Sequence, residues 1–242
     1  MIRVENLRRT FGSVVAVDNV SFAAQDGAVT GLLGPNGAGK TTCLRMIYGL
    51  LRPDAGRIDV DGFDLLADPQ RAQARLGVLP DVSGLYPRLT TREHIEYFGE
   101  LRGLSTGEIR HRTDVWLDAL DMRPLADRRV SGFSHGERTK VALARALIHE
   151  PRNVLLDEPT NGLDVMSTRA VRDLIRRLRG QGRCVLFSSH IMQEVSALCD
   201  RIVVIAHGRV VADGTPDGLR ATTGKADLED AFVSLVEMEQ RT

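Results

Sequence analysis

One glycine-rich segment, Gly34-Pro-Asn-Gly-Ala-Gly-Lys-Thr41, constrains this chain more than any other. It fits the pattern G-x-x-x-x-G-K-[ST] at every fixed position, and it lies between a predicted buried strand (28–33) and a predicted helix (41–48). Glycines let the backbone curl so that successive N–H groups point inward at phosphates, and the following helix adds its positive N-terminal end. The segment therefore predicts a loop that binds the phosphates of a nucleotide.

Two side chains of this loop have specific expected roles. Lys40 supplies a mobile positive charge for the β- and γ-phosphates, and is expected to assist catalysis there. The Thr41 hydroxyl can bind Mg²⁺. The residues expected to surround the phosphates are Gly34, Pro35, Asn36, Gly37, Ala38, Gly39, Lys40, Thr41 and Thr42.

A second apolar segment, 153–156, ends in the carboxylates Asp157 and Glu158. An open α/β sheet presents its ligands at strand ends such as this one. We expect Asp157 to hold Mg²⁺, directly or through water, and Glu158 to orient and deprotonate the attacking water. His190 follows another strand of the same sheet, and is expected at the γ-phosphate, where an imidazole can hydrogen-bond an oxygen.

The remaining pattern predicts one α/β domain of 242 residues with an inserted helical lobe. After Pro151, predicted strands alternate with amphipathic helices, which implies a parallel sheet with helices on both faces. The segment 81–150 instead predicts helices, two of which open with capping boxes at Thr90 and Ser105. We expect 1–80 and 151–242 to form the core and 81–150 the helical subdomain.

Composition argues against several other classes of protein. Lys plus Arg and Asp plus Glu both total 32, so the net charge is zero and a strongly basic nucleic-acid binder is not indicated. No apolar run approaches the length of a membrane span, and no signal peptide precedes the first strand. The cysteines (Cys43, Cys184 and Cys199) suit a reducing compartment. We expect a cytoplasmic protein that reaches a membrane only by docking on a partner.

The segment Ser131-Gly-Phe-Ser-His-Gly-Glu-Arg138 resembles the signature motif of ATP-binding cassette (ABC) ATPases, usually Leu-Ser-Gly-Gly-Gln. Ser134 and Gly136 match that motif, and the other positions depart from it. Ser134-x-x-Glu137 is also a capping box, which places Ser134 at a helix N-terminus with free N–H groups. The resemblance implies that Ser134, Gly136 and Glu137 bind the γ-phosphate of ATP held by a second subunit.

This resemblance covers nearly the whole chain. It implies a P-loop NTPase (RecA-like) fold, with a parallel-sheet core, an N-terminal antiparallel β subdomain and an inserted α-helical subdomain, and it implies ATP and Mg²⁺ as cofactors. Phe11 lies where the family places an aromatic side chain that stacks on adenine. Asp81 lies where the family has a glutamine that binds Mg²⁺, and its added charge would strengthen metal binding or alter coupling. Residues 161–164 resemble the loop that makes contacts across the dimer.

Finer details of Pro80-Asp81, the signature segment and 161–165 most resemble the sodium-efflux (NatA-type) subclass of ABC-2-type exporters. The resemblance implies an ATP-hydrolysing subunit that pairs with a second copy or a paralogue. It would dock on a membrane-spanning permease at the cytoplasmic face of the inner membrane and drive Na⁺ efflux. Two alternatives stay open: a motor for export of drugs, lipids or glycans, and a soluble ABC ATPase that acts on ribosomes or DNA.

Overall fold

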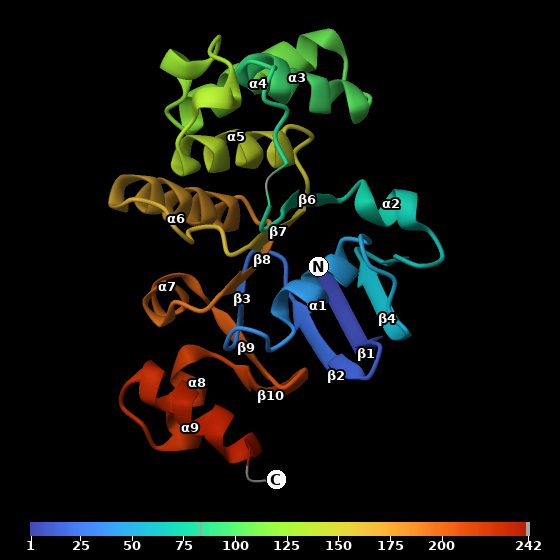
Figure 1. Ribbon diagram of the computed structural model, residues 1–242, viewed down its shortest axis with the longest axis vertical. Coiled ribbons are helices and arrows are strands. Elements are labelled where there is room, and N and C mark those ends of the chain that lie inside the picture. Colours follow the sequence, from blue (N-terminus) through green and yellow to red (C-terminus); the bar gives the residue numbers. More distant parts are fainter. Residues whose placement is uncertain (83, 241–242) are drawn as a thin grey trace.

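A computed structural model describes residues 1–82 and 84–240 of the chain. Two sheets organise it (Figure 1). The smaller is antiparallel, with the order β2-β1-β4-β5. Its strands are β1 (Ile2–Phe11), β2 (Val14–Ala24), β4 (Ala55–Val60) and β5 (Phe63–Asp64).

The larger sheet has the order β10-β9-β3-β8-β7-β6. Its strands are β3 (Val29–Leu33), β6 (Leu76–Leu79), β7 (Asn153–Asp157), β8 (Cys184–Ser189), β9 (Arg201–Ala206) and β10 (Arg209–Gly214). Neighbours from β9 to β6 are parallel, and β10 adds an antiparallel edge strand. The predicted parallel sheet is thus confirmed.

Helices cover both faces of this sheet. The α-helices of the described residues are α1 (Lys40–Ile47), α2 (Pro69–Gln73), α3 (Thr91–Leu101), α4 (Thr106–Ala119), α5 (His135–Leu147), α6 (Val165–Gly180), α7 (Met192–Leu198), α8 (Pro216–Thr223) and α9 (Leu228–Gln240). Figure 1 shows α3, α4 and α5 grouped at one end of the molecule, and α8 and α9 at the other. Within the described residues, none of these helices is long and apolar enough to cross a membrane.

The core consists of two apolar layers, one on each side of the large sheet. Because side chains alternate along a strand, successive residues of β8 enter different layers. Leu186 packs with α1 and the antiparallel sheet, whereas Phe187 packs with α5, α6, α7 and α9. Leu155 and Leu156 of β7 divide in the same way. The alternation of side chains along each strand therefore determines which side of the sheet a strand-end residue faces.

Local sequence explains how the helical region is built. Thr90 and Ser105 form the two predicted capping boxes, each with the glutamate three residues later, and they start α3 and α4. The first two strands are long: β1 and β2 have 10 and 11 residues. Asn6 and Asn19 take left-handed conformations at bulges in this pair, which breaks the alternation that a sequence pattern can follow.

The arrangement confirms the expected fold class: a parallel-sheet core, a separate N-terminal antiparallel sheet and an inserted group of helices. The helices of the insertion follow β6 and precede β7, two neighbouring strands of the large sheet. Chain segments that enter and leave the helical region therefore start and end beside each other in the core.

Candidate functional site

A cavity of about 500 Å³ lies at the carboxyl-terminal edge of the large sheet. Its walls come from the loop after β3, the start of α1, and the segments that follow β6, β7 and β8. The lining residues are Ala16, Asn36, Gly37, Ala38, Gly39, Lys40, Thr41, Thr42, Asp81, Glu158, Asn161 and His190. Most of the residues predicted for the phosphates line this cavity, and so do Glu158, His190 and Asp81. Asp157, the fourth residue predicted for catalysis or metal outside that loop, is not part of the lining.

Close packing requires glycine at two positions of the loop between β3 and α1. A Cβ atom on Gly34 would lie far inside van der Waals contact with the carbonyl oxygen of Ile205. Gly39 has φ +103, and a Cβ there would collide with the carbonyl oxygen of Ala16. The loop is therefore pressed against β9 and β2, with room only for backbone. This contact holds the start of α1 toward the cavity.

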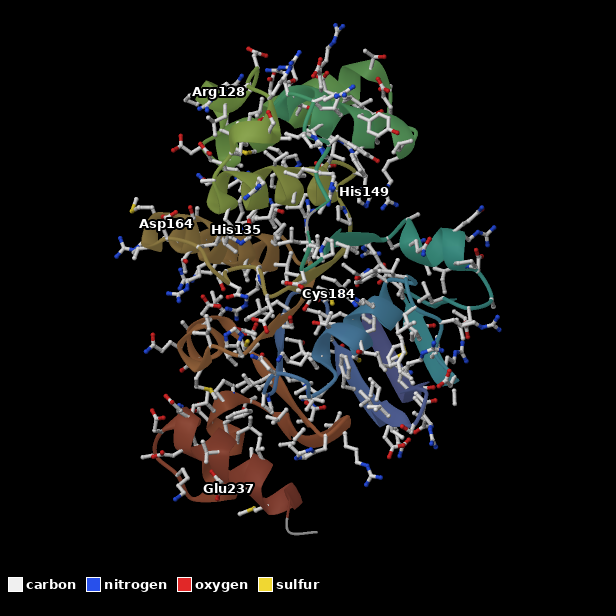
Figure 2. The ribbon with its side chains drawn as sticks, in the orientation of Figure 1. Arg128, His135, His149, Asp164, Cys184 and Glu237 are labelled. Carbon is white, nitrogen blue, oxygen red and sulfur yellow. The ribbon has the colours of Figure 1, made fainter. Side chains whose placement is uncertain are left out.

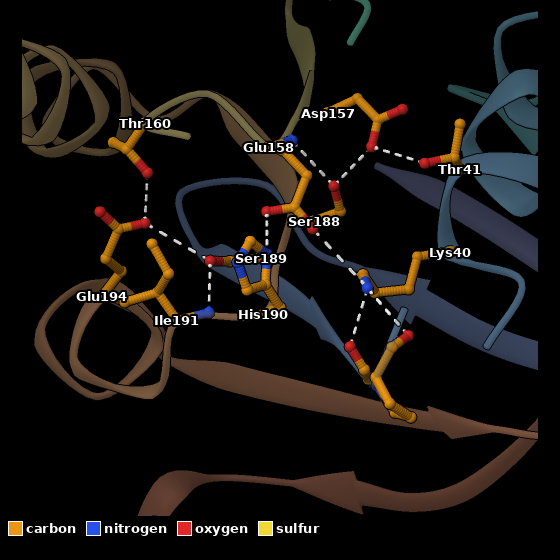
Figure 3. A network of polar contacts seen from close by, with 12 residues as sticks. Lys40, Thr41, Asp157, Glu158, Thr160, Ser188, Ser189, His190, Ile191 and Glu194 are labelled. Carbon is orange, nitrogen blue, oxygen red and sulfur yellow. Dashed lines mark hydrogen bonds and ion pairs between the residues drawn. The ribbon is translucent and has the colours of Figure 1, made fainter. Parts of the chain in front are cut away.

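Lys40 begins α1 and is 6% exposed. Its Nζ donates hydrogen bonds to the carbonyl oxygens of Gly34 (2.7 Å) and Pro35 (3.2 Å), and lies 3.6 Å from Oε1 of Glu158 (Figure 3). The ammonium group is thereby held between the phosphate-loop backbone and the carboxylate that follows β7. A cation in this position can meet the terminal phosphates of a nucleotide and the group that attacks them.

Asp157 ends β7 and points to the α1 side of the sheet. Its Oδ1 accepts hydrogen bonds from the hydroxyls of Ser188 (2.6 Å) and Thr41 (3.2 Å). Its Oδ2 is buried and has no hydrogen-bond partner among the described residues. Burial raises the pKa of this carboxyl, and the Ser188 and Thr41 hydrogen bonds oppose that rise.

These donors fit Mg²⁺, which prefers hard oxygen ligands. Thr41 and Asp157 offer a hydroxyl and a buried carboxylate oxygen that lacks a partner. Among the described residues, no group of three or more His, Cys, Asp or Glu side chains could hold a metal by itself. Mg²⁺ bound here would therefore take its other ligands from phosphate and water, as it commonly does beside nucleotides.

Glu158 and His190 form a direct pair at the opposite wall. His190 Nδ1 lies 2.9 Å from Glu158 Oε2. The Glu158 backbone has a left-handed φ of +48, and its N–H donates to Ser188 Oγ at 2.9 Å. Ser188 thus links the Asp157 carboxylate to the Glu158 backbone, because the same hydroxyl donates to Asp157. The pair presents a base beside an imidazole, the arrangement needed to take a proton from water.

Sequence reasoning missed Ser188 as part of the site. Ser188 can be assigned to the site only when the order of the strands is known, because it is the register partner of Asp157 across β7 and β8. It also did not assign Ala16 to the cavity wall, where β2 reaches the loop between β3 and α1.

The other predicted residues lie outside this cavity. Phe11 ends β1 with 48% of its side chain exposed, and the Arg9 guanidinium lies 5.0 Å from its ring centre. Ser134 caps α5 and forms the predicted capping box with Glu137. A Cβ on Gly136 would lie 2.5 Å from Ser167 Oγ, so the start of α5 packs on the start of α6.

His135 joins the signature segment to the loop before α6. Its Nε2 lies 3.0 Å from the carbonyl oxygen of Asn161, a residue that lines the cavity. Figure 2 shows His135 near Asp164, which caps α6 through the N–H groups of Met166 and Ser167. Ser134 and Gly136 therefore lie beside, and not inside, the chain's own cavity.

Comparisons with known proteins agree with this geometry. A family model described as "ABC transporter" matches residues 17–161. The chain is 47% identical over 222 residues to the ABC transporter ATP-binding protein NatA of Bacillus subtilis (strain 168), covering 91% of this chain and 90% of NatA. It is 38% identical over 231 residues to the Nod factor export ATP-binding protein I of Paraburkholderia xenovorans (strain LB400), covering 96% and 76% of the two chains.

A solved structure shares the fold. "Structure of ATP binding subunit of ABC transporter" superposes with a TM-score of 0.90 at 30% identity, covering 97% of this chain and 99% of the other. The phosphate loop, the two strand-end carboxylates and the capped signature helix occur together on this fold. This chain therefore belongs to the ABC transporter family, as an ATP-binding subunit that hydrolyses ATP to drive transport.

Proposed function

We propose that this subunit powers Na⁺ efflux, as one half of a dimer docked on a membrane-spanning permease. Lys40, Glu158 and His190 meet around one cavity, and Asp157 is hydrogen-bonded to Thr41 of its lining. This convergence carries the motor part of the proposal. The sodium part rests on the resemblance of the motif details to the sodium-efflux subclass and on the 47% identity to NatA.

In this scheme each residue of the cavity has one task. The loop backbone and Lys40 bind the phosphates of ATP, while Thr41 and Asp157 would hold Mg²⁺, which would supply positive charge to those phosphates. Glu158 accepts the proton of the attacking water, and His190 holds Glu158 in place through the 2.9 Å contact. Asp81, on the cavity wall, adds negative charge on the metal side.

The second subunit would complete the site. Ser134, Gly136 and Glu137 lie outside the chain's own cavity, at a helix N-terminus suited to an anion. Val165 and Met166, at the start of the neighbouring α6, are each 72% exposed. Burial of these side chains and of the signature residues against a second copy would place the α5 N-terminus at the partner's γ-phosphate.

A groove of about 430 Å³ is the proposed permease contact. Its lining is largely apolar and includes the exposed side chains of Leu50 and Val82. Arg102, Arg145 and His149 add basic groups at its edge (His149 is labelled in Figure 2). Asp81 lines both this groove and the nucleotide cavity, so a change at the phosphates can reach the permease through this position. The subunit would then lie peripherally on the cytoplasmic face of the inner membrane.

Two variants test the motor. Glu158→Gln should abolish steady-state ATP hydrolysis, because the base is lost, and should accumulate ATP-bound dimers on a sizing column. Ser134→Arg should prevent those dimers, because the arginine would occupy the contact, while a single subunit still binds ATP. Wild-type turnover in the first variant, or persistent ATP-driven dimers in the second, would refute the assignment of the composite site.

A transport assay identifies the cargo. Inverted membrane vesicles that contain this chain and its encoded permease should accumulate Na⁺ when supplied with ATP, and the Glu158→Gln vesicles should not. ATP hydrolysis without Na⁺ movement would refute sodium as the cargo and leave drugs, lipids or glycans to be tested in the same vesicles.

A further inference from the structure

Glu194 is a buried acid outside the site described above. It lies on α7 with 2% of its surface exposed, next to the core residue Val195. Burying a carboxylate costs free energy of folding unless the group is well hydrogen-bonded. The partners of Glu194 therefore indicate its role.

Two partners of Glu194 come from the ends of two different strands, β7 and β8 (Figure 3), and a third comes from α6. Its Oε2 accepts a hydrogen bond from the Thr160 hydroxyl and another, at 3.4 Å, from the Ser189 hydroxyl. Its Oε1 lies 3.4 Å from Nη2 of Arg172 on α6. Thr160 follows Glu158 by two residues, and Ser189 immediately precedes His190. One carboxylate oxygen thus joins the two segments that carry the base and the imidazole.

Strand geometry explains how Glu194 reaches this point from behind the sheet. Side chains at the end of β8 alternate, so Ser188 meets Asp157 on the α1 side while Ser189 faces α7. Ser189 Oγ also accepts the N–H of Ile191 at 3.0 Å, which fixes the turn that contains His190. Glu194 therefore supports the site from the opposite face of the sheet without lining the cavity.

We propose that Glu194 is a positioning residue for ATP hydrolysis. By holding Thr160 and Ser189 together, it sets the separation between the segments after β7 and β8, and so keeps His190 against Glu158. The inference rests on the roles proposed above for Glu158 and His190. It adds that the contact between them depends on a third acidic residue on the far side of the sheet.

The test separates turnover from ATP binding in the purified full chain. Glu194→Ala removes the shared acceptor and should lower kcat roughly 10–100-fold, the effect of a small misplacement of catalytic groups. KM for ATP should stay within about twofold of wild type, because the phosphate loop and Lys40 lie outside this network. Glu194→Gln keeps an oxygen that can accept from both hydroxyls, and should restore most of kcat.

A matched variant excludes simple loss of packing. Val195→Ala truncates a fully buried neighbour on the same helix, and should lower Tm as Glu194→Ala does while leaving kcat unchanged. Thr160→Val removes only one donor and should lower kcat with KM unchanged. This variant replaces Glu194→Ala as the test if the alanine variant does not fold.

Three results would overturn the inference: wild-type kcat in Glu194→Ala and Thr160→Val, equal losses of kcat in Glu194→Ala and Val195→Ala, or no rescue by Glu194→Gln. The Glu158→Gln variant in the same assay keeps the two proposals apart. If it retains turnover, the site assignment itself fails. If it is inactive and the Glu194 variants are not impaired, only the role of Glu194 fails.

Discussion

Replacing His94 by glutamine should remove part of the acid sensitivity of folding. His94 is fully buried on α3, with its ring stacked on those of Tyr86 and Phe98 at centroid distances of 5.6 and 5.5 Å. Its Nε2 accepts the backbone N–H of Tyr86 at 3.1 Å, so the proton of the neutral ring lies on Nδ1. Burial, with a contribution from the charge of Arg145, lowers the pKa of His94 from 6.5 to about 4.

The sign and size of the effect follow from that pKa. In the unfolded chain His94 takes up a proton below pH 6.5, whereas in the folded chain it does so only below about pH 4. Stability is therefore lost as the pH falls through this window, by about 3 kcal/mol in full and by about 2 kcal/mol between pH 7.5 and pH 5.

Urea denaturation at pH 7.5 and pH 5 measures this loss in wild type and in His94→Gln, which keeps an acceptor for Tyr86 but does not titrate. Wild type should lose about 2 kcal/mol more than the variant over this interval. Other titrating groups, including His149, whose pKa burial also lowers to about 4, are present in both proteins and cancel. Equal losses in the two proteins would show that the burial of His94 does not control its protonation.

Two further predictions concern the core. Gly34→Ala should destabilise the fold by more than about 2 kcal/mol, because the added Cβ collides with the backbone of Ile205. Gly37→Ala should cost about 1 kcal/mol, because Gly37 has φ +80 but an added Cβ has no atom of the described residues within 4 Å. Similar urea midpoints would contradict this. Cys43 and Cys184 are buried and burial raises the pKa of each to about 12, so neither should react with a maleimide before unfolding, as mass spectrometry of the labelled native protein will show.

Much of the fold could be predicted because the second half of the chain has strong periodic signals. The strands after Pro151 are apolar runs and the helices between them are amphipathic, so their alternation indicated a parallel sheet. Short elements were missed. β6 has only four residues, too few for a clear periodic pattern. β10 follows a tight turn at His207 and Gly208, both with positive φ, and can be predicted only when that turn is recognised.

The order of strands in the sheet could not be predicted from periodicity. β3 lies between β8 and β9, which both come much later in the chain, and nothing in the hydrophobic pattern specifies that neighbourhood. The phosphate loop and the pair Asp157-Glu158 could be located because their chemistry resides in contiguous residues. Ser188 and Glu194 could not, because their partners come from other strands and helices.

The end of β8 explains why these contacts belong together. Three consecutive side chains there meet three different carboxylates: Ser188 donates to Asp157, Ser189 to Glu194, and His190 contacts Glu158. Since β7 and β8 are parallel neighbours, their ends are fixed in register, and alternation sends the middle side chain to the opposite face. A small displacement of this one strand end would therefore disturb the proposed metal binding, the proposed proton transfer and the proposed support behind them at the same time.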